Sequence, residues 1–348
     1  MAFTKPPTES RKAIARAGRL LLAKEATPEE IDRAQQLVNQ WRSCHAYPIN
    51  TFQSTLKSKL RNYGGNSLSA QRLKRMPTII NKLERIPTMQ VITMQDIGGV
   101  RAVMSSLVDV YKLADEYREA TRFKHKLVKQ KDYIQEPSDD DGYRSIHLIY
   151  RYTNELAPEY NGLLIELQIR TKLQHIWATA VETMGTLLGQ ALKSSQGDDE
   201  WLHFFRIVSH LFALKEGTPA VPCYSHLSRA EVIDEITRIQ QKLGVFQKMR
   251  ALTTATRVIN SDEKTWAYHL IVLNSAARSV EVTSYGRTEL ARATADYENS
   301  ERQASEGSPI EPVLVSAGPL QSIRSAYPNY FLDTREFLSI LTEELNSR

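Results

Sequence analysis

The stretch LLIELQIRTKLQHIWA, residues 163–178, contains the pattern that decides the fold. Aliphatic and polar residues alternate through its first half, which predicts a strand over 163–170. One face of this strand carries three polar side chains, those of Glu166, Gln168 and Arg170. The second half changes to helical spacing, and its apolar stripe predicts a helix over 171–191. A strand that leads directly into an amphipathic helix is expected for an α/β (α+β) protein.

Helices and strands alternate on the N-terminal side of this stretch. The expected elements are two helices within 8–45, a helix over 69–83 broken near Pro77, a turn and buried strand within 91–104, a helix over 107–121, a strand over 123–133, an acidic loop over 135–142 and a strand over 143–152. Short connections join the last three strands. We therefore expect an antiparallel or mixed sheet.

Helices continue on the C-terminal side until about residue 255, where the pattern changes. The expected elements are helices over 200–215 and 228–255, a hairpin of 266–273 and 279–285, a helix over 288–302, a strand over 313–316 and helices near 319–326 and 334–346. We therefore predict two domains, residues 1–255 and a smaller α+β domain at 256–348.

The composition is that of a soluble protein. The chain has 348 residues, 41% hydrophobic and 24% charged, and no apolar run approaches the roughly 20 residues of a membrane span. The N-terminus has no apolar core of signal-peptide length. Cys44 and Cys223 lie far apart in sequence, which excludes a disulfide framework or the usual zinc spacing. We expect a cytoplasmic protein.

The positive charge is concentrated locally. The net charge of +5 is too small to indicate nucleic acid by itself. Residues 57–85 nevertheless contain eight Lys or Arg side chains and one carboxylate, and residues 122–131 contain five Lys or Arg side chains. Two basic surfaces are therefore available for phosphate.

Four segments together supply cations, carboxylates and an aromatic surface, as phosphoryl transfer requires. The candidates are Arg72, Lys74, Lys82 and Arg85; Asp96 before Gly98 and Gly99; Tyr143 after Gly142; and the strand face with Glu166, Gln168 and Arg170. The glycines suggest a tight turn that brings Asp96 to a phosphate and a hard cation. Each segment alone also fits a structural role: a solvated helix face, a turn, a core tyrosine or an exposed sheet edge.

The combination resembles the RelA/SpoT synthetase family. The resemblance rests on R-L-K-x-x-x-T-x-x-x-K from Arg72, D-I-G-G-V-R from Asp96, D-G-Y-R-S-I-H from Asp141 and E-L-Q-I-R-T-x-x-Q-H-x-W-A from Glu166, and it covers roughly residues 50–190. It implies a nucleotidyltransferase-like mixed sheet flanked by helices. It also implies transfer of pyrophosphate from ATP to a ribose hydroxyl.

The resemblance also implies a role for each matching residue. Arg72 and Arg101 would sandwich the adenine of ATP, and Lys74 and Lys82 would hold its phosphates. Asp96 and Glu166 would bind Mg²⁺, and Glu166 would activate the attacking hydroxyl. Tyr143 would stack on the acceptor base, and Gln168, Arg170 and His147 would line the pocket. Arg85 is a further candidate for the phosphates by its place in the same basic stripe. The loop before Gly142 is acidic where the family usually has lysine, which argues against GDP or GTP as acceptor. No His-Asp hydrolase motif is present.

The run VLVSAGPLQSIRSAYPNYFLDT, residues 313–334, is similar to the antitoxin-like region of the CapRel branch, the fused toxin–antitoxin synthetases of phage defence. In that branch the domain is pseudo-zinc-finger-like, and a Tyr-x-x-Tyr pair matching Tyr327 and Tyr330 blocks the ATP site. The alternative is that these tyrosines brace a turn.

From these resemblances we expect an autoinhibited toxin that pyrophosphorylates the 3′-terminal adenosine of tRNA and blocks translation. A phage protein, such as a major capsid protein, would bind the C-terminal domain and release it. Four lysines, Lys124, Lys126, Lys129 and Lys131, would contact the tRNA backbone. We expect a monomer. The alternatives are an alarmone synthetase that uses GDP or GTP, and a catalytically inactive nucleotide-binding scaffold.

Overall fold

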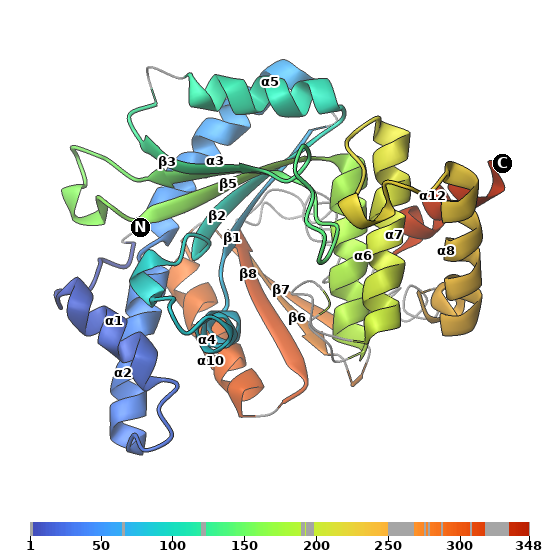
Figure 1. Ribbon diagram of the computed structural model, residues 1–348. Coiled ribbons are helices and arrows are strands. Elements are labelled where there is room, and N and C mark those ends of the chain that lie inside the picture. Colours follow the sequence, from blue (N-terminus) through green and yellow to red (C-terminus); the bar gives the residue numbers. More distant parts are fainter. Residues whose placement is uncertain are drawn as a thin grey trace.

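A five-stranded mixed sheet lies at the centre of the molecule (Figure 1). The computed structural model describes residues 3–64, 67–119, 123–188, 192, 198–249, 268–274, 276–277, 279–286, 288–306, 308–316 and 334–347. The strands lie in the order β1 (Leu68–Leu73), β2 (Gly98–Met104), β5 (Leu164–Thr171), β4 (Ile146–Arg151) and β3 (Lys126–Asp132). β2 and β5 pair in parallel, and the other three pairs in this sheet are antiparallel. The mixed sheet confirms the predicted fold class.

Helices α3 (Ala46–Leu60) and α5 (Leu107–Arg118) cover one face of this sheet. Alternate residues of the strands project from that face, so Phe52 of α3 and Leu113 of α5 are buried with Leu167 of β5 in one apolar core. The same core takes side chains from α1 (Arg11–Leu20), α2 (Pro28–Ser43) and α4 (Met76–Arg85).

A second core is built by helices at the end of the sheet where β5 finishes (Figure 1). These helices are α6 (Lys172–Leu188), α7 (Asp199–Glu216), α8 (Arg229–Leu243) and α12 (Arg335–Asn346). Trp177 of α6, Phe205 of α7 and Phe337 of α12 are buried together there. The core therefore joins the last helix of the chain to α6, α7 and α8.

A three-stranded sheet with the order β7-β6-β8 lies next to β1. Its elements are β6 (Tyr268–Asn274), β7 (Ser279–Tyr285), α10 (Leu290–Ser305) and β8 (Ile310–Ser316). α10 packs on this sheet through Ala293 and Tyr297. The β6–β7 pairing confirms the predicted hairpin. The helix predicted near 319–326 and the domain boundary predicted near 255 lie outside the described residues.

Two predicted elements differ from the structure, and one helix was not predicted. The helix expected over 69–83 is wrong in its first half, because Leu68–Leu73 pairs with β2 as a strand; α4 begins at Met76, with Pro77 in its first turn. The unpredicted helix is α3. The helix expected over 228–255 is interrupted after Leu243, because Gly244 has a left-handed φ of 62°, and residues 245–249 are helical again.

Short 3₁₀ turns complete the described structure. They are η1 (Arg61–Tyr63), η2 (Val91–Thr93), η3 (Pro158–Tyr160) and η5 (Pro222–Tyr224). The η2 turn leads toward β2, as predicted. Among the described helices, none combines the length and the apolar character that crossing a membrane requires.

Candidate active site

One face of the central sheet is polar, and the strand register gathers the predicted site residues on it. Arg101 of β2 is paired with Gln168 of β5, and Gln168 is paired with His147 of β4. Glu166 is paired with Gly99. Directly paired residues project to the same face of a sheet. Three segments that are separate in sequence therefore share one surface.

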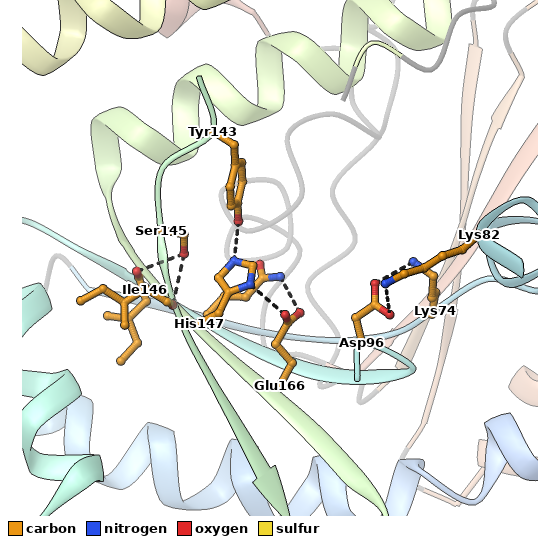
Figure 2. Close-up of polar contacts among 10 residues, drawn as sticks. Lys74, Lys82, Asp96, Tyr143, Ser145, Ile146, His147 and Glu166 are labelled. Carbon is orange, nitrogen blue, oxygen red and sulfur yellow. Dashed lines mark hydrogen bonds and ion pairs between the residues drawn. The ribbon is translucent and has the colours of Figure 1, made fainter. Parts of the chain in front are cut away.

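Lys74, Lys82 and Asp96 form one half of this surface, which we call the lysine–aspartate cluster (Figure 2). The Nζ atoms of Lys74 and Lys82 each lie 2.9 Å from an oxygen of Asp96. Burial alone would raise the pKa of Asp96, but the two ammonium groups outweigh it and hold that pKa well below its usual range. Burial lowers the pKa of Lys74 to about 8, although Asp96 opposes the shift.

Backbone contacts place this cluster. The amide of Lys74 donates to the carbonyl oxygen of Ile97 at 2.7 Å, so the residue after β1 is fixed beside the residue before β2. Lys82 reaches the same carboxylate from α4. Arg72 of β1 is paired with Gly99 of β2, and the charge of Arg72 further lowers the pKa of Lys74.

Gly98 and Gly99 do not form the predicted tight turn. Both lie within β2, and neither has a positive φ. A Cβ at Gly98 would lie 3.0 Å from side-chain atoms of Ile49 and Ile165. A Cβ at Gly99 would lie 3.4 Å from the carbonyl oxygen of Glu166. The glycines therefore allow close packing around β2.

Tyr143, His147, Glu166 and Gln168 form the other half, which we call the tyrosine–glutamate chain (Figure 2). The hydroxyl of Tyr143 lies 3.0 Å from Nε2 of His147. Nδ1 of His147 lies 2.9 Å from Oε1 of Glu166. The Gln168 amide donates to the second oxygen of Glu166 at 2.7 Å. Both carboxylate oxygens are thus held in place.

This chain keeps Glu166 ionised although only 7% of the residue is exposed. Burial alone would raise the pKa of Glu166, but His147 and Gln168 lower it. Burial alone would lower the pKa of His147, but Tyr143 and Glu166 raise it to about 9. At neutral pH the two side chains therefore form an imidazolium–carboxylate pair.

A tight turn places Tyr143 at the entrance to this chain. Gly142 has a φ of 72°, and a Cβ there would lie 3.0 Å from Cβ of Ser209 in α7. The amide of Tyr143 donates to the carboxylate of Asp141 at 2.9 Å. Asp139 accepts from the amide of Cys223 at 3.0 Å. The acidic loop is therefore tied both to itself and to the α7–α8 connection.

Two arginines place positive charge beside the chain. Arg170 is 2% exposed and contacts Nδ1 of His175, while its Nε and Nη1 have no hydrogen-bond partner. The buried Nε of Arg101 also has none. Burial, followed by the charge of Arg101, lowers the pKa of Arg170 to about 9. Because unsatisfied buried donors are costly, these atoms favour an anionic or polar ligand.

Sequence reasoning missed two aromatic neighbours of the site. The ring of Tyr133 lies 5.2 Å from that of His147 and 5.7 Å from that of Tyr143, measured between centroids. Tyr133 shares the strand alternation of Lys131, which is paired with His147; this alternation was the available signal. His175 was part of a quoted motif but had been given no role.

Arg85 and the lysines predicted to bind tRNA are exposed. Arg85 is exposed at the last residue of α4. Lys124 pairs with Glu155 at 3.1 Å, and exposed lysines of the edge strand β3 are Lys126, Lys129 and Lys131. Their roles stay predictions. Tyr327 and Tyr330 lie outside the described residues.

Asp96 and Glu166 suit a magnesium ion that arrives with a nucleotide. They are close enough for Asp96 to oppose the ionisation of Glu166. Mg²⁺ usually takes one or two protein carboxylates and completes its shell with water and substrate phosphates. In the part of the chain that the structure describes, no group of three or more His, Cys, Asp and Glu residues could hold a metal. The donor set therefore fits a substrate-bound ion.

Part of the chain is similar to known proteins. Residues 71–184 match a family described as a region found in RelA / SpoT proteins. The chain is 38% identical over 110 residues to the GTP pyrophosphokinase YjbM of Bacillus subtilis, and 35% identical over 113 residues to the GTP pyrophosphokinase YwaC of the same organism. Each match covers 31% of this chain, and the chain spans about half the length of these relatives, 51% and 52%.

Among solved structures, the chain is similar to small alarmone synthetase 1 from Bacillus subtilis bound to its product pppGpp. The match has a TM-score of 0.43 and 23% identity, and it covers 50% of this chain and 89% of the other. The matched range, residues 71–184, contains every candidate catalytic and nucleotide-binding residue.

Proposed function

We propose that the protein is a pyrophosphokinase that transfers a pyrophosphate group from ATP to a ribose hydroxyl. The observation that carries this proposal is that one sheet face holds both the lysine–aspartate cluster and an ionised, oriented Glu166. A transfer site needs cations for the donor phosphates and a carboxylate for the acceptor hydroxyl. The similarity to two GTP pyrophosphokinases supports the proposal.

The lysine–aspartate cluster serves as the donor side. Lys74 and Lys82 would exchange their contacts with Asp96 for contacts with ATP phosphates, while Arg72 and Arg101 would flank the adenine. Magnesium held by Asp96 and Glu166 would neutralise phosphate charge when the nucleotide is bound. Asp96 opposes the lowering of the Lys74 pKa by burial, which favours the charged form of that lysine before ATP binds.

The tyrosine–glutamate chain serves as the acceptor side. The 3′-oxygen of the acceptor attacks the β-phosphorus of ATP, and the bond between that phosphorus and the α,β-bridging oxygen breaks. AMP leaves with the electron pair, and Glu166 takes the hydroxyl proton. The product carries a ribose 3′-diphosphate. Tyr143 would hold the acceptor base against its ring.

We further propose that the acceptor is the 3′-terminal adenosine of tRNA. Residues 138–141 contain three aspartates next to Tyr143 and no lysine, so a free nucleotide's 5′-phosphates would meet negative charge. The exposed lysines of β3 would favour a polyanionic acceptor. The alternative acceptor is GDP or GTP, which would give an alarmone.

The test is a transfer assay with ATP labelled at the γ-phosphate. The full chain is incubated separately with deacylated tRNA, GDP and GTP, and Asp96→Asn serves as the inactive control. Label in tRNA alone supports the proposal. Label in GDP or GTP alone replaces the tRNA acceptor with the alarmone alternative. Label in no acceptor, with the full chain and with its Tyr327→Ala, Tyr330→Ala variant alike, overturns the pyrophosphokinase assignment.

We also propose that the chain is an autoinhibited, monomeric, cytoplasmic toxin of phage defence. The segment with Tyr327 and Tyr330 would block the ATP site until a phage protein, such as a major capsid protein, binds. The support is the sequence similarity of residues 313–334. The double variant Tyr327→Ala with Tyr330→Ala should transfer label without a trigger and be toxic in cells. A silent double variant in an otherwise active enzyme would remove the autoinhibition.

A further inference from the structure

Helix α4 has an N-terminus without a cap of its own. The N-cap residue Arg75 makes no side-chain capping hydrogen bond, and the first turn contains no acidic residue. Helix N-termini carry unpaired amides and a partial positive charge, and they are usually satisfied by a nearby acceptor or carboxylate. The local sequence of α4 supplies neither.

A carboxylate from the C-terminal part of the chain occupies this position. Oε1 of Glu301, in α10, accepts from the amide of Met76 at 3.1 Å. Met76 is the first residue of α4, 225 positions earlier in the chain. Both residues are buried, with Met76 4% and Glu301 6% exposed. α10 thus provides the missing cap for α4.

Arg42 of α2 completes a buried network around this cap. Its Nη2 lies 3.1 Å from Glu301, and its Nη1 donates to the hydroxyl of Tyr297 at 3.0 Å. The Tyr297 hydroxyl in turn donates to Glu301 at 2.5 Å. Nη1 of Arg42 also lies 3.5 Å from the carbonyl oxygen of Lys74. The network therefore holds the backbone on both sides of Arg75.

The held segment carries both lysines of the donor side. Lys74 lies next to the N-cap residue Arg75, and Lys82 lies in the last turn of α4, where it reaches Asp96. A shift of the α4 N-terminus would move both ammonium groups relative to the carboxylate. Small displacements of groups that position a substrate have large effects on binding and rate.

We propose that Glu301 is a positioning residue for ATP, which caps α4 from the C-terminal part of the chain and thereby aligns Lys74 and Lys82. The inference rests on the proposed function, because it assigns ATP phosphates to those lysines. It adds that the three-stranded sheet and α10 contribute to the donor side through a buried contact. The contact is made by described residues and is separate from the segment that holds Tyr327 and Tyr330.

The test compares Glu301→Ala with Glu301→Gln and Gln303→Ala in the full chain, with and without the Tyr327→Ala and Tyr330→Ala changes. Glutamine at position 301 retains an oxygen that can accept from Met76. Gln303 is exposed on the same helix, so its replacement is the matched control. ATP affinity is measured by calorimetry, and amide hydrogen exchange is followed over residues 76–85.

We expect Glu301→Ala to weaken ATP binding about tenfold and to speed exchange at the start of α4. We expect Glu301→Gln to weaken ATP binding about threefold, because the amide keeps a cap acceptor but loses the charge pair with Arg42. We expect Gln303→Ala to bind ATP as the wild type does. Unchanged ATP affinity in Glu301→Ala, with or without a loss of thermal stability, overturns the positioning role.

Because removal of Glu301 leaves Arg42 buried without its partner, Glu301→Ala can unfold. Glu301→Gln and Tyr297→Phe then decide, since both keep a cap acceptor and remove part of the network. If either variant folds and binds ATP more weakly than the wild type, the positioning role is supported. If both bind ATP as tightly as the wild type, the positioning role is overturned. If neither the wild type nor the Tyr327→Ala, Tyr330→Ala chain binds ATP, the proposed function itself fails. Normal ATP binding with no response to Glu301 removes only the positioning role.

Discussion

The two halves of the candidate site are built in different ways. The lysine–aspartate cluster lies at the end of the sheet, where the side chains of Lys82 and Asp96 are 21% and 25% exposed and only Lys74, at 9%, is buried. The tyrosine–glutamate chain is a more deeply buried relay, with His147 and Glu166 side chains 16% and 10% exposed. Ion pairs near solvent exchange partners at little cost, whereas a buried relay is fixed before a ligand arrives.

This difference suggests a division of labour. In the lysine–aspartate cluster, Asp96 pairs with Lys74 and Lys82, and the phosphates of ATP would replace it as their partner. The tyrosine–glutamate chain orients the Glu166 carboxylate and keeps it charged. If the comparison is correct, substitutions in the lysine–aspartate cluster should affect ATP binding and transfer differently. Substitutions in the tyrosine–glutamate chain should affect the transfer rate and the pH dependence of stability.

Asp96→Asn should give the largest effect, a loss of transfer of at least about 10³-fold to any acceptor. The variant removes a predicted magnesium ligand but leaves both lysines, so ATP without magnesium should bind at least as tightly as to the wild type. Transfer rates and calorimetry check these two expectations. Asp115→Asn, on the exposed side of α5, is the control. Full activity in Asp96→Asn would refute the metal assignment.

Glu166→Gln should lower the transfer rate by about 10²- to 10³-fold while ATP binding changes less, because the proton acceptor is lost. Single-turnover kinetics with saturating ATP measures the chemical step. Glu159→Gln, at an exposed position, should behave as the wild type. A rate within twofold of the wild type would show that Glu166 does not take the proton.

The His147–Glu166 pair should make stability depend on pH. The pKa of His147 is raised from its ordinary value near 6.5 to about 9 in the folded chain, so the folded state binds the proton more tightly. The contribution is fully present below about pH 6.5 and is lost as pH rises through about 9, and it amounts to at most about 3 kcal/mol.

Urea denaturation of the wild type and His147→Gln at several pH values tests this effect. The free-energy difference between them should shrink between about pH 6.5 and 9. His226→Gln, at an exposed position, should show no such trend. A difference that grows with rising pH would contradict the ion pair.

Tyr143→Phe should have the smallest effect, a fall in transfer rate of about fivefold, corresponding to one hydrogen bond of about 1 kcal/mol. The ring remains, so KM for the acceptor should change little. Tyr133→Phe is the matched control, because Tyr133 contacts His147 through its ring. Equal transfer rates in both variants would mean that the hydrogen bond of the Tyr143 hydroxyl does not contribute to the tyrosine–glutamate chain.

The site could be predicted well where it depends on strand alternation. Glu166, Gln168 and Arg170 were assigned to one strand face, and β5 places Glu166 and Gln168 in contact there. Asp96 and Lys74 were linked only by the family resemblance, and their ion pair depends on the packing of β1, α4 and β2. The role of Gly98 was misjudged, because its close neighbour Ile49 lies on a helix that was not predicted.

The polar face of β5, the acidic loop before Tyr143, the basic segments and the resemblance of residues 50–190 follow from the amino-acid sequence, because they are properties of neighbouring residues. The folded structure was needed to show that residues 68–73 form a strand, that His147 pairs with Glu166 and that Glu301 caps α4. Hydrophobic periodicity indicates the type of one element and which of its faces is buried. Strand pairing and a cap from 225 residues away depend on which surfaces meet when the chain folds, and no local pattern encodes that choice.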